Sequence, residues 1–490
     1  MMLHNKKPAK YEKYAIIILI IAIIIHFSLI PIYTVSGDAC WHFSASKFIG
    51  NNVQIPLFDN IGRDEPFWAP PLFHIIAALF SSVFSVFGSG FGLKLISPLF
   101  GSMSLIVSYL ILKKFLNEKA LFYSILFLSF IPIFIDYSIL GYVESMLTFF
   151  VLLSIYFALN SQLVLSSIAV GLAILTKYNG IFVIPVILFI VYKNYNRKLF
   201  SKNAAIALII PLIISLPWFI RNWVLLGNPI YPFLNFIFGG FGQRAFSTID
   251  LTNLFSIKTY IITYLGFFGV PDGNYNTFFF IDLSYLPILL SVFLIATIIF
   301  IIPVFFGLRK NKWDIFHILL LSYGILFILY IINVGPFVSR ILLPTIISLA
   351  FFYGIGMERI TSKYKIGALF SILVILISAG FVITEAAKFT IASRSWDVYQ
   401  EDFNWVKSNT NKEDIFIAGG QCVQYHIDRT SLFPSELKTG RYDYIWVNQN
   451  FMLDERSILS KEHLQEIEGK NKELAYENKK TSTKIYKLVQ

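Results

Sequence analysis

Residues 14–35 read YAIIILIIAIIIHFSLIPIYTV, an apolar run without a charged residue. About 20 such residues in a helix cross the hydrocarbon core of a bilayer, so the run predicts a membrane-spanning helix. It is too long for the core of a signal peptide and lacks a convincing small-residue cleavage site, which favours a retained helix. Of the 490 residues, 56% are hydrophobic, and the mean hydropathy is +0.67. A soluble fold cannot bury so much apolar surface, so we expect a polytopic membrane protein.

Further apolar runs follow along the chain, and short basic loops separate several of them. The runs cover 71–88, 92–112, 120–136, 145–160, 163–176, 180–192, 204–220, 285–306, 314–333, 341–357 and 366–385. Basic residues between apolar runs mark cytoplasmic loops, so the net charge of +11 reflects topology and excludes nucleic-acid binding. If all of these basic loops are cytoplasmic, the number of membrane crossings between them works only when one early apolar segment does not cross the membrane. Run 71–88, with its Pro-Pro start and Gly-rich end, is the best candidate for a re-entrant or interfacial segment.

The predicted fold is mainly α: a membrane helical bundle of about 11–13 helices with a small extracytoplasmic α/β domain at the C-terminus. We expect a membrane domain over 1–389, with a first outer loop at 36–70, and a soluble domain over 390–490. In the soluble domain the pattern predicts helices over 398–409 and 461–469, and strands over 414–418, 442–447 and 484–488. The two cysteines, Cys40 and Cys422, imply neither a metal site nor a disulfide framework.

Acidic residues gather at predicted helix ends on the outer face. Asp38 follows the first apolar run, Asp64 and Glu65 lie in the first outer loop, Asp136 ends the fourth run, and Glu144 opens the next. Two or three carboxylates in a cleft can act as a general base or hold a divalent cation. Asp64 and Glu65 can equally be solvated or paired with Arg63. Asp38 and Glu144 abut membrane helices, where an unused charge is costly, and are the stronger candidates.

Three basic residues stand on the predicted outer face, against the positive-inside trend. They are Lys177 in Thr176-Lys177-Tyr178, Arg221 in Trp218-Phe219-Ile220-Arg221, and Arg340 just before an apolar run. Cations at the membrane boundary suit a phosphate whose lipid tail stays in the bilayer. The alternative is snorkelling of each side chain to lipid headgroups.

Two histidines, His42 and His74, lie in the same outer region as Asp38. Together with carboxylates they could bind a metal such as zinc. The alternative is an ordinary hydrogen-bonding role. A divalent metal ion is therefore an open possibility, and its ligands are not fixed by the sequence.

The order of several short motifs resembles the GT-C glycosyltransferases that use lipid-linked sugars, in the branch of protein O-mannosyltransferases and aminoarabinose transferases. The motifs are Gly37-Asp38, Pro70-Pro71-Leu72, Leu95 to Gly101, Gly141-Tyr142-Val143-Glu144, Gly171 to Tyr178, Pro217-Trp218 to Pro232, and the closing Ile485-Tyr486-Lys487. The resemblance implies that Asp38 is the general base. It implies that Glu144 is the second acidic residue, which orients the acceptor or supports a metal, and that Arg340 lies near the donor phosphate.

The sequence departs from the family pattern at two places. Ala39 follows Asp38 where the mannosyltransferases often have Glu, and Trp68-Ala69 stands where the aminoarabinose transferases carry Glu-Lys before their Pro-Pro. The second departure disfavours aminoarabinose as the sugar.

The resulting hypothesis is an inverting transfer of a sugar, with mannose one candidate, from a polyprenyl or dolichyl phosphate donor to an acceptor hydroxyl at the outer leaflet. The acceptor is a protein, a lipid or a glycan, and the membrane lipids are the other partner. Short loops rich in Ile and Lys favour a prokaryotic plasma membrane, an archaeal one included. The alternative is a transporter or flippase of lipid-linked sugars. Such a protein should carry acids or broken helices near the bilayer midplane and an internal repeat. In this chain the helix centres are almost free of charge, the acids gather at one face, and no inverted repeat is found.

Overall fold

The computed structural model describes residues 10–58, 66–87, 90–194, 201–240, 250–268, 294–308, 314–334, 339–439, 442–448 and 459–489. The chain divides into two compact units. The first comprises residues 1–31, 69–73 and 94–385, and the second comprises 32–68, 74–93 and 386–490. The second unit therefore combines the C-terminal part of the chain with two early segments.

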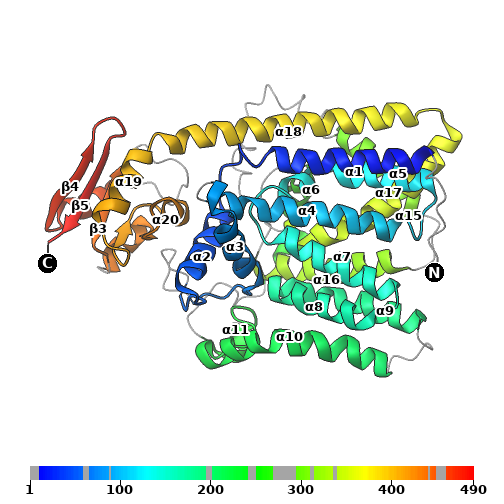
Figure 1. Cartoon of the computed structure of the whole chain (residues 1–490), viewed down its shortest axis with the longest axis horizontal. Helices are drawn as coiled ribbons and strands as arrows, with labels where there is room; N and C mark the ends of the chain where they lie inside the picture. The colour runs from blue at the N-terminus through cyan, green and yellow to red at the C-terminus, as the bar shows by residue number, and fades with distance from the viewer. Residues whose placement is uncertain are drawn as a thin grey trace. The chain divides into compact units, whose positions relative to one another are not determined.

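The first unit is built from apolar helices that lie side by side (Figure 1). Six helices in the described part of the chain are long and apolar enough to cross a membrane: Lys10–Ser28, Phe91–Leu112, Lys202–Leu226, Ile315–Asn333, Ser339–Lys363 and Gly367–Ile391. Shorter apolar helices accompany them at Leu72–Val83, Glu144–Leu159, Leu163–Thr176, Tyr178–Asn194 and Leu294–Leu308. The predicted mainly helical membrane fold is confirmed.

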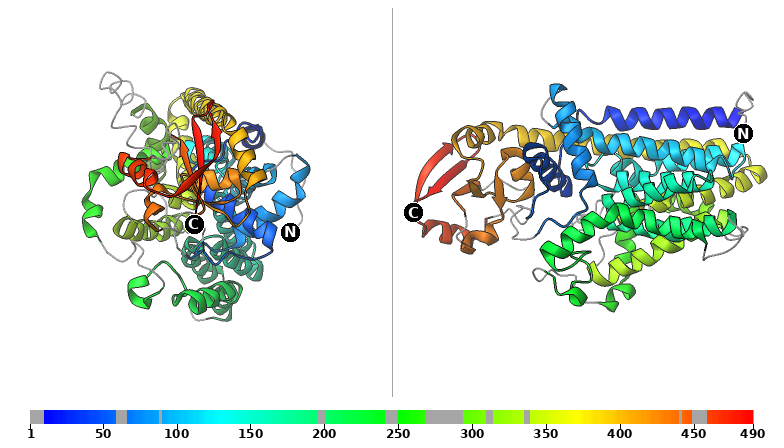
Figure 2. Two further views of the ribbon diagram at one scale, coloured as in Figure 1. Left: turned by 90° about the vertical axis from the view of Figure 1, so that its left-hand side faces the viewer. Right: turned by 60° about the horizontal axis from the view of Figure 1, so that its bottom comes forward.

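The helices of the first unit are named as follows. They are α1 (Lys10–Ser28), α4 (Phe91–Leu112), α5 (Glu118–Phe130), α6 (Pro132–Tyr137), α7 (Glu144–Leu159), α8 (Leu163–Thr176), η2 (Tyr178–Val183), α9 (Ile184–Asn194), α10 (Lys202–Leu226), α11 (Asn235–Phe238), η3 (Leu251–Phe255), α12 (Ile257–Phe267), η5 (Thr297–Ile301), α15 (Ile302–Leu308), α16 (Ile315–Val334), η6 (Ser339–Thr345), α17 (Ile346–Lys363) and α18 (Gly367–Asp397), which continues into the second unit. The right-hand view of Figure 2 shows the neighbouring helices α7, α8, α9 and α10 in cyan and green.

Local sequence fixes several of these helix ends. Asn117 precedes α5, and its side chain accepts the backbone N–H of Ala120. Ser201 caps α10 in the same way through the N–H of Ala204. Both caps satisfy a backbone donor that the first helical turn leaves without a partner. Gly227 ends α10 in the left-handed region with φ 70°, which a residue without Cβ adopts at little cost.

Glycine also permits the close approach of α15 and α17. A Cβ on Gly307 would collide with the backbone carbonyl of Phe352, and a Cβ on Gly356 would collide with that of Pro303. Small residues at helix contacts let backbones pack closely where lipid supplies no hydrophobic driving force between helices. These two positions therefore explain why α17, which follows Arg340, lies so close to α15.

The second unit contains α2 (Asp38–Asn52), most of α3 (Leu72–Val83), η1 (Ser85–Phe87) and the C-terminal domain. The predicted outer loop over 36–70 thus includes a helix that the sequence analysis did not foresee. Helix α3 has 12 residues. At 1.5 Å per residue it is about 18 Å long, short of the ~30 Å hydrocarbon core. This length agrees with the expectation that run 71–88 does not cross, which stays a prediction.

The C-terminal domain is a five-stranded sheet with the strand order β2-β1-β3-β5-β4. The elements are α19 (Gln400–Asn409), β1 (Ile415–Ile417), α20 (Gln421–Ile427), β2 (Thr430–Leu432), η7 (Pro434–Thr439), β3 (Tyr444–Asn448), α21 (Lys461–Glu468), β4 (Lys472–Asn478) and β5 (Thr483–Leu488). Strand β1 pairs in parallel with β2 and β3, and β5 pairs antiparallel with β3 and β4. The predicted small α/β domain is confirmed, although β2, β4 and α20 were not foreseen.

A buried carboxylate holds part of this domain together. Asp402 in α19 is fully buried and accepts four side-chain hydrogen bonds from the β4–β5 hairpin. The donors are Tyr476, Asn478, Thr481 and Thr483, at 2.6–2.8 Å. Burial, and next the bond to Asp402, raise the pKa of the Tyr476 hydroxyl, which therefore stays protonated and donates. Asp402 links the hairpin to the helix that precedes the sheet.

Candidate functional site

The best-defined polar cluster of the first unit is centred on Glu144, the first residue of α7. Only 1% of this residue is exposed. Lys177 Nζ lies 2.6 Å from Glu144 Oε1, and Arg340 Nε lies 3.7 Å from the same oxygen. A buried charge is tolerated when opposite charges compensate it, and here two cations share one carboxylate. The structure thus brings together three of the predicted site residues.

Each member of the Glu144 cluster stands where a helix begins or ends. Glu144 lies in the first turn of α7, where the helix dipole favours a negative charge. Lys177 follows the last residue of α8 in an extended conformation, with φ −159° and ψ 140°, and separates α8 from η2. Arg340 is the second residue of η6, just before α17. Its guanidinium carbon lies 5.6 Å from the ring centre of Tyr142.

Arg221, the third predicted cation, belongs to a neighbouring group in α10. Its guanidinium carbon lies 4.7 Å from the ring centre of Trp218, and its Nη1 donates to Asn222 Oδ1 at 2.9 Å. Trp218 Nε1 and Asn222 Nδ2 both donate to the hydroxyl of Tyr178, each at 2.9 Å. Because Tyr178 directly follows Lys177, this hydroxyl ties the Arg221 group to the segment that carries Lys177.

Sequence analysis missed Tyr178, Trp218 and Asn222 as supporting residues. A signal was present in the sequence, since Trp218, Arg221 and Asn222 follow the i, i+3, i+4 spacing of one helix face. Trp218 and Asn222 meet their partner, Tyr178, because α8 packs against α10. The spacing of residues within α10 does not reveal this tertiary contact.

Asp38 begins α2 in the second unit. Gly37 precedes it at φ 57°, a conformation that favours glycine. Two contacts attach this region to α20: the side chain of Gln421 donates to the carbonyl of Gly37 at 2.8 Å, and Cys40 forms a disulfide with Cys422. The sequence implied no disulfide framework and did not predict this single bond, which the structure contains. Spacing rules could not find this pair, because the two cysteines are separated by 382 positions in the sequence.

The two predicted histidines contact each other in the second unit. His42 Nδ1 and His74 Nε2 lie 2.9 Å apart, and both residues are buried. Trp41 and Phe67 pack around them, with ring centres 5.6 and 5.1 Å from that of His74. In the described parts of the chain, no group of three or more His, Cys, Asp and Glu residues could hold a metal. The metal role of the histidines stays a prediction. Asp64 and Glu65 lie outside the described residues.

Comparisons with known proteins agree with this fold. The family described as dolichyl-phosphate-mannose-protein mannosyltransferase matches residues 68–220, a range that includes Glu144 and Lys177. No curated protein matches the chain.

Several solved structures share the fold, among them the following two. ArnT from Cupriavidus metallidurans, bound to undecaprenyl phosphate, is similar with a TM-score of 0.65 and 13% identity, over 97% of this chain and 98% of that one. The archaeal oligosaccharyltransferase AglB from Archaeoglobus fulgidus, in complex with an inhibitory peptide and a dolichol-phosphate, is similar with a TM-score of 0.58 and 14% identity, over 98% of this chain and 75% of that one. The resemblance inferred from the sequence is confirmed: the chain shares the fold of ArnT and AglB, and its residues 68–220 match the dolichyl-phosphate-mannose-protein mannosyltransferase family.

Proposed function

We propose that this chain is a membrane glycosyltransferase that moves a sugar from a polyprenyl phosphate donor to an acceptor hydroxyl. The observation that carries the proposal is the pair of cations on buried Glu144. Lys177 and Arg340 both lie beside the same carboxylate oxygen, which gathers two cations at one place. Two such cations suit a lipid-linked phosphate.

The same two cations also assist the departure of the lipid phosphate. A phosphodiester donor carries one negative charge, and its phosphate gains more as the bond to the sugar breaks. Positive groups fixed in advance stabilise charge that develops in the transition state. Glu144 orients Lys177 and Arg340 before the donor arrives, and Arg221, anchored through Trp218 and Asn222, adds a further positive charge. We assign the donor phosphate to these three cations.

Asp38 is assigned the role of general base, as the resemblance implies. It takes a proton from the acceptor hydroxyl as that oxygen attacks the anomeric carbon, which inverts the configuration of the sugar. The Gln421 bond to Gly37 and the Cys40–Cys422 disulfide anchor the start of α2, where Asp38 stands. Mannose is the sugar favoured by the family match over residues 68–220.

The disulfide also supports a location for the reaction. Disulfides form and persist in oxidising compartments and are rare in the cytosol. We therefore place the second unit, with Asp38, on the extracytoplasmic side, consistent with a prokaryotic plasma membrane.

The test is a transfer assay with the purified chain in detergent and a panel of polyprenyl phosphate sugars, including mannose. Transfer from one or more donors is expected. Replacing Asp38 by Asn should lower the turnover rate about 10²–10⁴-fold, the usual contribution of a general base, at unchanged expression. A fully active Asp38→Asn enzyme would remove Asp38 from the mechanism, and a chain that transfers no sugar from any donor would refute the proposed activity.

A further inference from the structure

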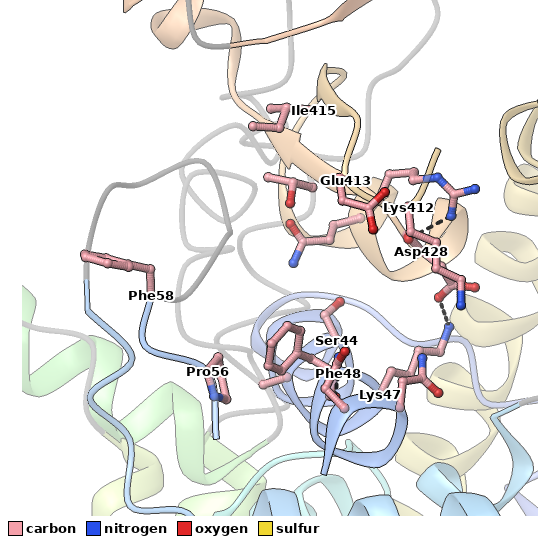
Figure 3. Close-up of a pocket in the computed structure, with 15 residues that line it drawn as sticks. Ser44, Lys47, Phe48, Pro56, Phe58, Lys412, Glu413, Ile415 and Asp428 are labelled. Carbon is pink, nitrogen blue, oxygen red and sulfur yellow. Dashed lines mark hydrogen bonds and ion pairs between the residues drawn. The ribbon is translucent and has the colours of Figure 1, made fainter. Parts of the chain in front are cut away.

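The second unit contains a cavity of about 500 Å³ that the proposed reaction does not explain (Figure 3). Ser44, Lys47 and Phe48 of α2 line one side, and Lys412, Glu413 and Ile415, before and within β1, line the other. Small-molecule sites typically enclose about 300–1,000 Å³. The cavity is therefore large enough for a ligand of more than a few atoms.

The charges that line the cavity are largely compensated within the protein. Lys47 pairs with Asp428 at 2.8 Å and also donates to the carbonyl of Tyr425. Arg429 is buried and donates to the carbonyls of Lys407, Thr410 and Asp428 and to the Thr410 hydroxyl. Lys412 and Glu413 are adjacent charges of opposite sign. The five charged lining residues are three cations and two anions, but Lys47 and Arg429 are engaged by protein oxygens, which leaves few charged donors for a phosphate.

Neutral polar groups and apolar surfaces make up the rest of the lining. Asn51, Asn52 and Gln424 supply amides, and Phe48 and Phe58 supply aromatic rings. Ser44 and Thr430 add hydroxyl-bearing side chains to the lining. Sugars present hydroxyls that both donate and accept hydrogen bonds, together with C–H faces that pack on aromatic rings. The mixture of amides, hydroxyls and rings matches this chemistry.

The position of the cavity along α2 sets its relation to the proposed base. The first lining residue of α2, Ser44, comes six positions after Asp38, and Asn52 comes fourteen positions after it. At 1.5 Å per residue these positions lie about 9 to 21 Å from Asp38 along the helix axis. A ligand in the cavity is therefore displaced from a hydroxyl that reacts at Asp38, as the remote part of an extended molecule would be.

We propose that this cavity binds a neutral carbohydrate, the remote end of a glycan acceptor. The assignment to an acceptor rests on the proposed glycosyltransferase activity, whereas carbohydrate binding does not. Binding energy from a remote part of a substrate can be used to orient its reacting end, so a longer glycan should be the better acceptor.

Binding is tested first without a donor. The full chain in detergent is titrated with neutral oligosaccharides of glucose, mannose or N-acetylglucosamine and, separately, with inorganic phosphate. Ligand-observed magnetic resonance reports the bound fraction. We expect at least one oligosaccharide to bind and phosphate not to compete with it. The absence of oligosaccharide binding, or displacement of the sugar by phosphate, would overturn the proposal.

The chain offers a matched pair of variants. Asn52 ends α2 and donates to the carbonyl of Phe48 at 2.9 Å, while Asn409 ends α19 and donates to the carbonyl of Trp405 at 2.8 Å. Only Asn52 lines the cavity. Asn52→Ala should weaken oligosaccharide binding about 2- to 10-fold, the usual range for one lost hydrogen bond, and Asn409→Ala should leave it unchanged. Equal effects of the two variants would refute the placement of the sugar.

A separate kinetic measurement tests whether the bound sugar is part of an acceptor. With an active donor, Asn52→Ala should raise KM for long glycan acceptors and leave transfer to a short acceptor unchanged. If the sugar binds in the cavity but Asn52→Ala does not alter KM for any acceptor, the acceptor assignment fails. If the chain transfers no sugar at all, the proposed activity fails, and the binding data still decide whether the cavity takes carbohydrate.

Discussion

Replacing Lys177 by Met tests the electrostatics of the Glu144 cluster most directly. Met keeps much of the length and apolar volume of Lys and removes the charge. At an effective dielectric constant of about 20, attraction to Glu144 amounts to about 6 kcal/mol for Lys177 at 2.6 Å and about 4.5 kcal/mol for Arg340 at 3.7 Å. Lys177 is thus the stronger partner, and its loss leaves a buried carboxylate undercompensated.

The expected cost in stability follows from measurements on buried ion pairs. Removing one partner typically costs about 3–5 kcal/mol, because the other charge stays buried. Glu144 has a side-chain exposure of 2% and Lys177 one of 17%, so solvent screens this pair weakly. Lys177→Met should therefore lower the melting temperature of the purified chain in detergent. Lys114→Met is a suitable control, because Lys114 is exposed and donates only to Asn160 among the described residues.

The same variant should impair donor use. A hydrogen bond to a charged group contributes about 1.5–3 kcal/mol, which corresponds to roughly 10- to 100-fold in kcat/KM for the lipid phosphate donor. The assay is initial-rate transfer at varied donor concentration. Lys114→Met should keep the rate of the unmodified chain.

A double variant separates the two effects. Glu144→Gln in the Lys177→Met background removes the undercompensated carboxylate, so stability should recover in part. Transfer should not recover, since the phosphate still lacks a cation. A double variant that is less stable than Lys177→Met would refute the ion pair. A stable Lys177→Met chain with unchanged donor kinetics would refute the phosphate role.

Three further outcomes are expected. Arg340→Ala should raise donor KM more than it lowers kcat, as measured by initial rates; unchanged donor KM would contradict its contact with the phosphate. Asp402→Ala leaves the buried hydroxyls of Thr481 and Thr483 in the β4–β5 hairpin without this acceptor and should cost at least about 2 kcal/mol, at 1–3 kcal/mol for each donor. Limited proteolysis of the C-terminal domain should then accelerate, and exposed Glu401→Ala is the control. The unreduced chain should take up no thiol reagent, whereas the denatured and reduced chain should be labelled at both Cys40 and Cys422; labelling before reduction would contradict the disulfide.

Several features could be predicted because they depend on local patterns. Long apolar runs such as 14–35 predicted membrane helices, since no other arrangement satisfies the backbone in a bilayer. The polar pattern of the tail predicted α19, α21 and strands β1, β3 and β5. Strands β2 and β4 were not predicted, because β2 spans only three residues and β4 carries the charged residues Lys472, Glu473 and Glu477. Their pairing, rather than their composition, makes them strands.

Among the candidate functional residues, too, local patterns predicted some features, and others depend on tertiary contacts. Lys177, Arg221 and Arg340 were recognised because cations on the predicted outer face run against the usual charge distribution. That Lys177 and Arg340 share Glu144 could not be foreseen, because these residues belong to three segments that are far apart in the sequence.

The sequence by itself determined that the chain is a helical membrane protein with a polar α/β domain at its end, because hydrophobic length and alternation are local properties. Only the tertiary structure decided that Cys40 meets Cys422, that His42 meets His74, and that Glu144 contacts two cations. These contacts join segments that are distant in the chain. Their cause is the free energy of packing and of pairing buried charges, which exists only once the segments are assembled.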